Sequence, residues 1–279
     1  MSHVAQSDAL DWTRSMLQGR IISELFSERV QHFVLKGGMA MKLRHQNARA
    51  TQDIDLDSLE TELVDIQKLV RRAIARATSD SILEGVTVSE PKQTETTARW
   101  RIKGFDPKTR QMLLLTVEIS QRDSISKDDV GVVPVVHKHQ EKNILVYTNK
   151  ALAFKKIKAL LSPSREATRD VSDLYLLIKG EVEAPFEALQ SLLPRDVEEI
   201  VGNMWRKIES MDTARFKSEV LPSLPATNQA QELYQNWDGI RIQVGVKLEE
   251  WIRHAHKMKM DESESQTPVQ KNSGKAHHA

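Results

Sequence analysis

The stretch FVLKGGMAMKLR, at residues 33–44, and the stretch RATQDIDLD, at residues 49–57, decide the fold of this 279-residue chain. The first is a short apolar run that two glycines stop, which predicts a strand entering a tight turn and then a helix. In the second, acidic and aliphatic residues alternate, and this period of two predicts another strand. Asp53 and Asp55 would then project to one side of that strand, away from the aliphatic residues.

The composition indicates a folded chain without cysteine chemistry. Hydrophobic residues make up 39% of it and charged residues 28%, which can supply a core and argues against a wholly disordered chain. Cysteine is absent, so disulfides, thiolate metal sites and cysteine nucleophiles are excluded. Lys and Arg number 40 against 39 Asp and Glu, so bulk charge does not predict a nucleic-acid binder, although a local basic patch remains compatible. No signal-peptide pattern or apolar run near ~20 residues is present, so we expect a cytoplasmic protein without a membrane partner.

The remaining sequence divides into a mixed part and a helical part. Apolar residues at helical spacing predict helices at 7–30, 60–78, 149–161, 169–179 and 194–211 and near 228–258. Runs of β-branched and alternating residues predict strands at 86–90, 96–104, 111–120, 132–136 and 144–147.

This order of elements predicts an α+β fold with two domains. The first is an α/β core with an N-terminal helix at residues 1–147, and the second is a helical domain at residues 148–260. Residues 261–279 contain almost no large apolar side chain, and we expect a disordered tail there.

Gly37 and Gly38 are the first candidate for a functional element. Two consecutive glycines between a strand and a helix let a ligand approach the main chain closely, and the N–H groups that open the helix would face a phosphate. The alternative is a plain turn, because a diglycine alone is a weak signal and the P-loop spacing is missing.

Carboxylates form the second candidate. Asp53 and Asp55 lie two residues apart on a predicted strand and could share a hard cation such as Mg²⁺, or they could lie on a solvated edge. Glu118 lies within the apolar run LLLTVEIS, where a carboxylate is unusual. It could complete the cluster if the two strands are neighbours, and it would otherwise be an ordinary rim residue.

The third candidate is a concentration of charge within residues 149–180. Lys156 and Arg169, together with neighbouring lysines, could bind triphosphate oxygens beside Asp170 and Asp173. The alternative is a solvated helix face with internal ion pairs, such as Arg169 with Asp173.

Taken in order, four motifs resemble those of the AbiEii/AbiGii-type toxins, a nucleotidyltransferase family within the polymerase-β-like nucleotidyltransferase superfamily. The motifs are FVLKGGMAMKLR, RATQDIDLD, LTVEIS and LAFKKIKALLSPSREATRDVSDLYLL, and they extend over residues 33–178. The resemblance implies a mixed-sheet polymerase-β-like core followed by an all-helical C-terminal domain. The last hundred residues match no part of the family pattern.

The resemblance also implies roles for particular residues. Asp53, Asp55 and Glu118 would hold Mg²⁺ and, with Lys156, would form the catalytic set. The implied nucleotide-binding residues are Lys36, Gly37, Gly38, Met39, Lys156, Arg169, Asp170 and Asp173. Met39 departs from the pattern, because the family often has Ser or Thr after the glycines. The missing hydroxyl removes one possible phosphate hydrogen bond, worth ~1.5–3 kcal/mol with a charged group.

The implied activity is Mg²⁺-dependent transfer of a nucleoside monophosphate from an NTP to a hydroxyl, either at a tRNA 3′ end or on a protein side chain. The implied setting is a bacterial toxin–antitoxin or phage-defence system with a cognate antitoxin as partner. A catalytically weakened member that only binds nucleotide or protein is an alternative, motivated by Met39. A D-x-D sugar-nucleotide glycosyltransferase is a third hypothesis, but it explains neither the diglycine nor the lysine-rich stretch.

Overall fold

A computed structural model describes residues 3–28, 32–45, 48–59, 63–79, 82–94, 96–122, 125–137, 140–163, 167–194, 196–225 and 227–265. Within them the strands are β1 (Phe33–Lys36), β2 (Asp53–Ser58), β3 (Glu84–Val88), β4 (Lys92–Gln93), β5 (Thr97–Phe105), β6 (Met112–Ser120), β7 (Val130–His137) and β8 (Gln140–Tyr147). The α-helices are α1 (His3–Glu28), α2 (Gly37–Arg44), α3 (Leu63–Thr78), α4 (Asn149–Leu161), α5 (Thr168–Lys179), α6 (Phe186–Gln190), α7 (Glu198–Ser210), α8 (Thr213–Glu219), α9 (Asn228–Gln235) and α10 (Trp237–Ser265). Two short 3-10 turns, η1 (Lys127–Asp129) and η2 (Leu221–Ser223), complete the elements.

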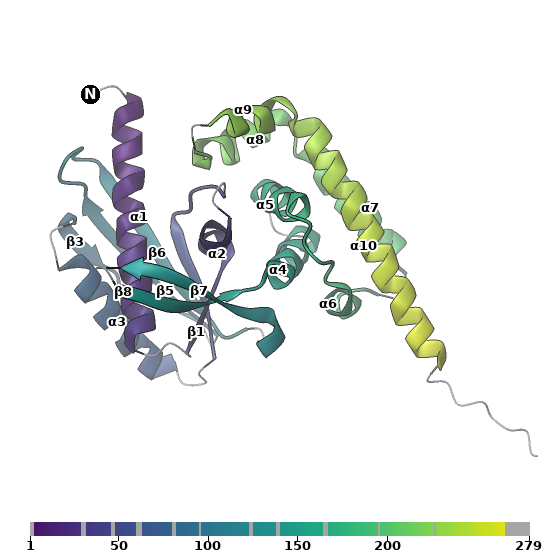
Figure 1. Ribbon diagram of the computed structural model, residues 1–279, viewed down its shortest axis with the longest axis horizontal. Coiled ribbons are helices and arrows are strands. Elements are labelled where there is room, and N and C mark those ends of the chain that lie inside the picture. Colours follow the sequence, from purple (N-terminus) through teal and green to yellow (C-terminus); the bar gives the residue numbers. More distant parts are fainter. Residues whose placement is uncertain are drawn as a thin grey trace, which may run out of the picture.

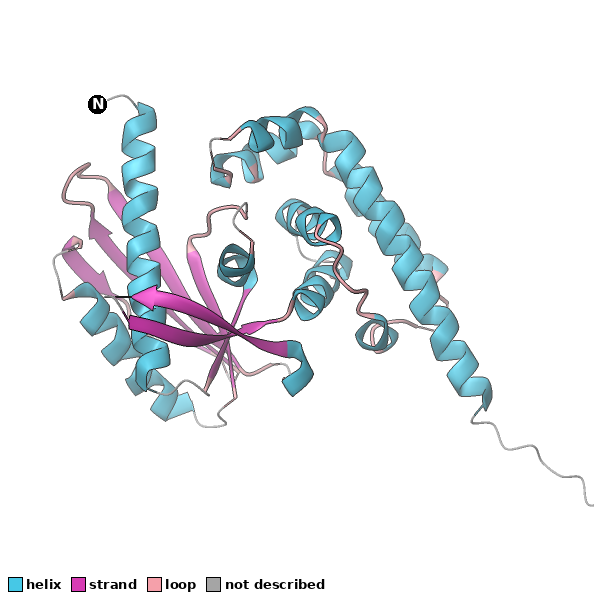
Figure 2. Ribbon diagram, viewed as in Figure 1, coloured by secondary structure: helices cyan, strands magenta, loops and turns pink. Residues whose placement is uncertain are grey.

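The strands form one mixed sheet, α1 to α3 alternate with its first strands along the chain, and every described element after β8 is helical (Figure 2). Among the described residues the sheet is eight-stranded, in the order β3-β5-β6-β2-β1-β8-β7, with β4 paired to β5. β2 pairs with β1 in antiparallel and with β6 in parallel fashion. The parallel pairing places Asp55 opposite Glu118 and Asp53 opposite Thr116. The predicted α+β class is therefore confirmed.

The period of two in the sequence divides each central strand between two environments. Ile54 and Leu56 of β2 are fully buried, as is Trp100 of β5, and they face α1 and α3 within the core. In Figure 1, α1 lies across the strands with α3 beside it. The acidic residues of β2 project to the opposite face, which α4 covers only in part, because Asp57 is buried whereas Asp53 is exposed. The far part of that face, over β5 and β6, remains open.

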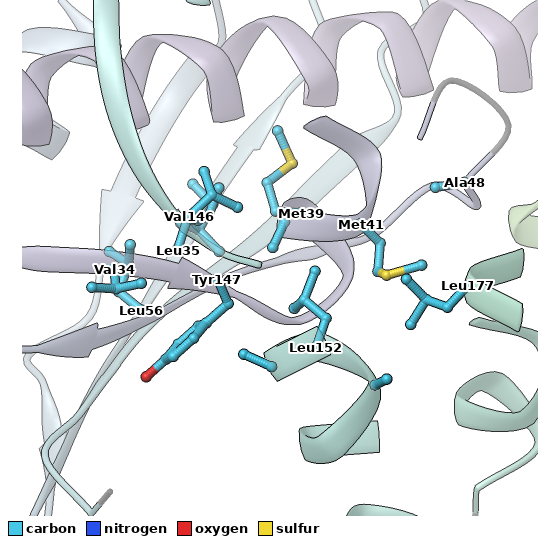
Figure 3. Close-up of a cluster of buried hydrophobic side chains, with 14 of the residues drawn as sticks. Val34, Leu35, Met39, Met41, Ala48, Leu56, Val146, Tyr147, Leu152 and Leu177 are labelled. Atoms are coloured by element: carbon cyan, nitrogen blue, oxygen red, sulfur yellow. The ribbon is translucent and has the colours of Figure 1, made fainter. Parts of the chain in front are cut away.

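The helices after β8 continue the same core. Thr148 caps α4, its hydroxyl accepting a hydrogen bond from the Ala151 amide at 3.3 Å, and this starts the helix directly after the strand. Buried side chains of α4, α5, α7 and α10 belong to one apolar cluster with those of the sheet. Figure 3 shows part of that cluster, where Met39 and Met41 of α2 lie among residues of β1, β8, α4 and α5.

Several element boundaries differ from the prediction. The expected helix near 228–258 is two helices, α9 and α10, which meet at Asn236. α10 continues to Ser265, five residues into the predicted tail, because adding polar residues to an existing helix is easier than starting one. The rest of that tail, residues 266–279, lies outside the described residues. β4, α6 and α8 were not predicted, and they are only two, five and seven residues long.

No helix in the described ranges combines the length and the apolar character needed to cross a membrane.

Candidate active site

A cleft of about 670 Å³ lies where β2, β6 and β5 meet α4. Three of the predicted site carboxylates, Asp53, Asp55 and Glu118, line it. Lys36, Gly37, Lys156 and Asp170 line it too, together with five further cations and several small or apolar residues. Lys155 and Lys158 are two of these five and belong to the lysine-rich stretch noted in the sequence, whereas Arg99, Arg101 and Arg122 had not been assigned to a site.

The diglycine turn touches the metal-binding candidate directly. Gly37 has a φ of +66°, in the left-handed region that glycine occupies without strain. A Cβ atom at Gly37 would lie 2.5 Å from Asp55 Oδ2, so only glycine leaves room for this carboxylate. At Gly38 a Cβ would lie 2.9 Å from the Thr51 Cβ. Both glycines are therefore required by close packing of the helix start against β2 and the residues before it.

The electrostatics of Asp55 reflect this enclosure. Burial, and then repulsion from Asp53 and Glu118, raise the pKa of Asp55 to about 6, although Lys36 and Lys156 oppose the shift. Negative charge is thus concentrated at the bottom of the cleft, and a cation bound there would be stabilised.

The donors fit Mg²⁺ when the substrate is counted. Within the described residues, no three His, Cys, Asp or Glu side chains are grouped so as to hold a metal ion by themselves. Mg²⁺ in nucleotide sites commonly takes one or two carboxylates and completes its shell with phosphate oxygens and water. Asp53 and Asp55 could supply the carboxylates.

Glu118 of β6 forms an ion pair with Arg99 of the neighbouring strand β5. Arg99 donates two hydrogen bonds to Glu118 Oε2, one of them 2.8 Å long from Nε, and the ion pair raises the pKa of Arg99. Register explains the contact, because Arg99 of β5 lies opposite Glu118, which in turn lies opposite Asp55 of β2. Glu118 thus lies beside the aspartates with its orientation fixed by a cation.

Lys156 belongs to a buried ionic network rather than to a solvated helix face. Its Nζ lies 2.8 Å from Asp170 Oδ1 and 2.6 Å from Asp173 Oδ2. Arg49 completes the network, with its Nε 3.2 Å from Asp173 Oδ1. Burial would lower the pKa of Lys156, but the charges of Asp173 and Asp170 outweigh it and raise this pKa. The alternative of a solvated face is wrong for Lys156 and its three partners, because all four residues are at most 9% exposed, whereas Arg169 is exposed.

The other predicted nucleotide-binding residues lie in different places. Arg169 lines a second cavity, of about 330 Å³, which shares Asp53 and Asp55 with the cleft, and its Nε donates to the Glu219 carbonyl at 3.0 Å. Asp170 lines both cavities, whereas Asp173 is not among their lining residues. The side chain of Met39 packs in the core and is 6% exposed. Only the main chain of Met39 is therefore available to a ligand.

Asp57 is a site residue that the sequence analysis did not single out. It is 1% exposed and accepts hydrogen bonds from the Tyr147 hydroxyl at 2.7 Å and from Lys155 at 3.1 Å. It also pairs with Lys36. The third aspartate of DIDLD thus holds two lysines that line the cleft, and the alternation of the strand was the only sequence signal for it.

With this geometry in view, comparison with known proteins assigns the family. A family model described as nucleotidyl transferase AbiEii toxin, type IV toxin–antitoxin system, matches residues 20–252. The chain belongs to this family. The resemblance inferred from the motifs over residues 33–178 is confirmed, but the match extends to residue 252, so the expectation that the last hundred residues match no part of the family is wrong for most of them. AbiEii membership makes the protein a nucleotidyltransferase toxin with a nucleotide substrate and an antitoxin as its implied partner.

Solved structures agree on the fold of this AbiEii chain. JHP933 from Helicobacter pylori is similar with a TM-score of 0.55 and 18% identity, over 91% of this chain and 95% of that one. A candidate nucleotidyltransferase from H. pylori has a TM-score of 0.54 and 18% identity, over 90% of this chain and 98% of that one. Sequence identity this low supports a similarity of fold and nothing further. Among curated proteins, none matches the sequence.

Proposed function

We propose that this AbiEii protein transfers a nucleoside monophosphate from an NTP to a hydroxyl acceptor and depends on Mg²⁺. The observation that carries the proposal is the convergence of Asp53, Asp55 and Glu118 with the Gly37 turn in one cleft lined by lysines and arginines. A cleft with carboxylates but no lysine or arginine side chains would suit only a metal ion. The added cations provide for a triphosphate of high negative charge.

The reaction makes one bond and breaks one. The acceptor hydroxyl oxygen attacks the α-phosphorus, the bond between that phosphorus and the β-phosphate oxygen breaks, and pyrophosphate leaves. Mg²⁺ held by Asp53 and Asp55 would neutralise charge on the phosphate oxygens. The Gly37 turn and the start of α2 present main-chain N–H groups to the phosphates. Lys36 and Lys155, positioned by Asp57, contribute positive charge to the wall of the cleft.

We assign Glu118 as the general base that accepts the proton of the acceptor hydroxyl. Both bonds from Arg99 go to its Oε2, so Oε1 forms no hydrogen bond within the described part of the chain. That oxygen can receive the hydroxyl proton, and the guanidinium of Arg99 holds the carboxylate in place while it does so.

The test is transfer of label from each α-labelled NTP, with Mg²⁺ or with EDTA, to total RNA or to total protein. Label is expected on one acceptor with one preferred NTP, and only with the divalent cation. Asp53→Ala and Asp55→Ala should each abolish transfer while the variants stay folded, as judged by circular dichroism. Near-normal transfer by either variant would show that the metal assignment is wrong.

The two alternative functions gain no support from the site. The hypothesis of a weakened, binding-only member rested on Met39, but its side chain lies in the core. All three carboxylates needed for catalysis line the cleft. The glycosyltransferase hypothesis does not fit a chain of a nucleotidyltransferase family.

A further inference from the structure

The open face of β5 and β6 forms a surface that runs outward from the carboxylates. Alternation places residues 99, 101, 103 and 105 of β5 on this face, because the residues between them are buried. Arg101 lies opposite Thr116, which lies opposite Asp53, so Arg101 shares a row with the metal candidate. Lys103 occupies the next row outward, and Phe105 the one after it. From Arg101 to Phe105 the strand extends about 14 Å.

The cations of this surface are available for a ligand. Arg99 is paired with Glu118, but the side chains of Arg101 and Lys103 form no ion pair within the described part of the chain. Both residues are exposed. Two unpaired cations at strand spacing beside a site for a triphosphate are a local basic feature in a protein whose net charge is only +1.

Apolar side chains lie at the outer end of the same surface. Phe105 is 47% exposed and lies opposite Met112, which is 59% exposed. Leu114, opposite Lys103, is also exposed. No described residue covers these three side chains fully. An exposed aromatic ring with apolar neighbours, in line with two cations, has the composition of a platform for an unpaired base.

We infer that this open face, from Arg101 to Phe105, binds single-stranded RNA and leads its terminal hydroxyl to Glu118 and the aspartates. The inference rests on the proposed function, since it names the acceptor of that reaction. Charge complementarity supports RNA, because successive cations along one strand match a backbone of repeated phosphates and the aromatic end matches the face of a base. A protein acceptor would present a single hydroxyl side chain and would have no need of both features.

The binding experiment uses a short, fluorescein-labelled single-stranded RNA of mixed sequence, without NTP, and measures anisotropy between about 50 and 200 mM salt. The double variant Arg101→Ala/Lys103→Ala should weaken binding, and its slope of log affinity against log salt should become shallower by about 0.7 for each cation removed. Phe105→Ala should raise Kd about fivefold or more with an unchanged slope, because a stacking contact releases no counterion. Lys217→Ala, at an exposed lysine of α8, is the matched control and should change neither quantity.

A second measurement separates this inference from the proposed function. The rise in melting temperature that NTP and Mg²⁺ cause should be the same in the wild type, in Lys103→Ala and in Phe105→Ala, because neither residue lines the cleft that holds Asp53, Asp55 and Gly37. The inference would be overturned if the double variant and Phe105→Ala bound RNA as tightly as the wild type. It would also be overturned if the labelled acceptor were a protein and these variants impaired that transfer. If the wild type binds RNA through this face but transfers no nucleotide to any acceptor, the surface stands and the proposed reaction fails.

Discussion

At the scale of single residues, the placement of Asp55 lowers stability in order to hold charge at the bottom of the cleft. Its pKa rises from 3.8 to about 6, so the folded state binds the proton more tightly than the unfolded state does. The favourable contribution is complete below the unfolded value and is lost as pH rises through about 6. At neutral pH the ionised carboxylate therefore costs about 3 kcal/mol of stability in metal-free solution.

Asp55→Asn should stabilise the metal-free protein at pH 7.5 and abolish transfer. The gain should shrink toward zero as pH falls below about 5, because the wild-type carboxyl is then protonated in the folded state. Urea unfolding in EDTA at several pH values measures it, and added Mg²⁺ should reduce the difference by stabilising the wild type alone. Equal stabilities of wild type and variant at pH 7.5 would contradict this account of the site.

Met39 illustrates how one residue can depart from a motif for a reason of packing. Its side chain lies in the core, so Met39→Ser should lower the free energy of unfolding by about 2–5 kcal/mol, the range for truncating a buried methionine. Met39→Leu conserves volume and should cost less than about 1.5 kcal/mol. Thermal melting compares the two. A serine variant that melts like the wild type and binds NTP more tightly would mean instead that this side chain reaches phosphate.

At the scale of elements, the turn between β1 and α2 joins fold to chemistry. Gly37→Ala places a Cβ 2.5 Å from Asp55 Oδ2 at a φ of +66°, so either the carboxylate or the start of α2 must move. We expect transfer to fall by at least about tenfold, with a loss of stability of about 1 kcal/mol or more. Gly202→Ala, in the interior of α7, meets nothing within 4 Å and is the control. It should leave activity unchanged and stabilise the protein by up to about 1 kcal/mol. Full activity of Gly37→Ala would separate this turn from catalysis.

How far the sequence could be interpreted also depends on the element. β2 was predictable because acidic and aliphatic residues alternate in it, and β5 because its buried residues alternate with exposed ones. β6 was predictable as an apolar run rich in strand-forming residues, and α4 because its apolar spacing begins directly after a threonine cap. α6 and α8 are too short to show a helical period. The carboxylates were recognisable by type and order, but sheet order and register, which bring Glu118 beside Asp55, are properties of the assembled sheet.

The ionic network was beyond sequence reasoning for a similar reason. Arg49 and Asp173 are separated by 124 positions, and nothing local to either indicates the other. The same holds for Tyr147 and Asp57, which are 90 positions apart. The packing of α5 against the residues before β2 makes the first pair and joins the sheet to the helices. The order of the sheet, in which β1 lies between β2 and β8, makes the second pair.

At the scale of the whole molecule, the sheet and the helices after β8 share their buried interactions. Lys155 of α4 bonds to Asp57 of β2, and Lys156 joins Arg49 through Asp173. The Ala50 amide also donates to the Ser223 carbonyl of η2 at 2.6 Å. Breaking a buried ion pair by removing one partner costs about 3–5 kcal/mol, so partial detachment of the helices would be expensive.

We therefore expect the predicted core and helical domain to unfold together in a single transition. Trp100 lies in β5 and Trp237 begins α10, and both are fully buried, so each reports on one part. In protein labelled with fluorotryptophan, the native fluorine NMR signals of the two residues should disappear at the same urea concentration. Asp173→Asn removes one charge from the network and should shift both midpoints down by the same amount. If the Trp237 signal were lost well before that of Trp100, the helices would be an independent domain, and the buried contacts between α4, α5 and the sheet would contribute little to holding the two parts together.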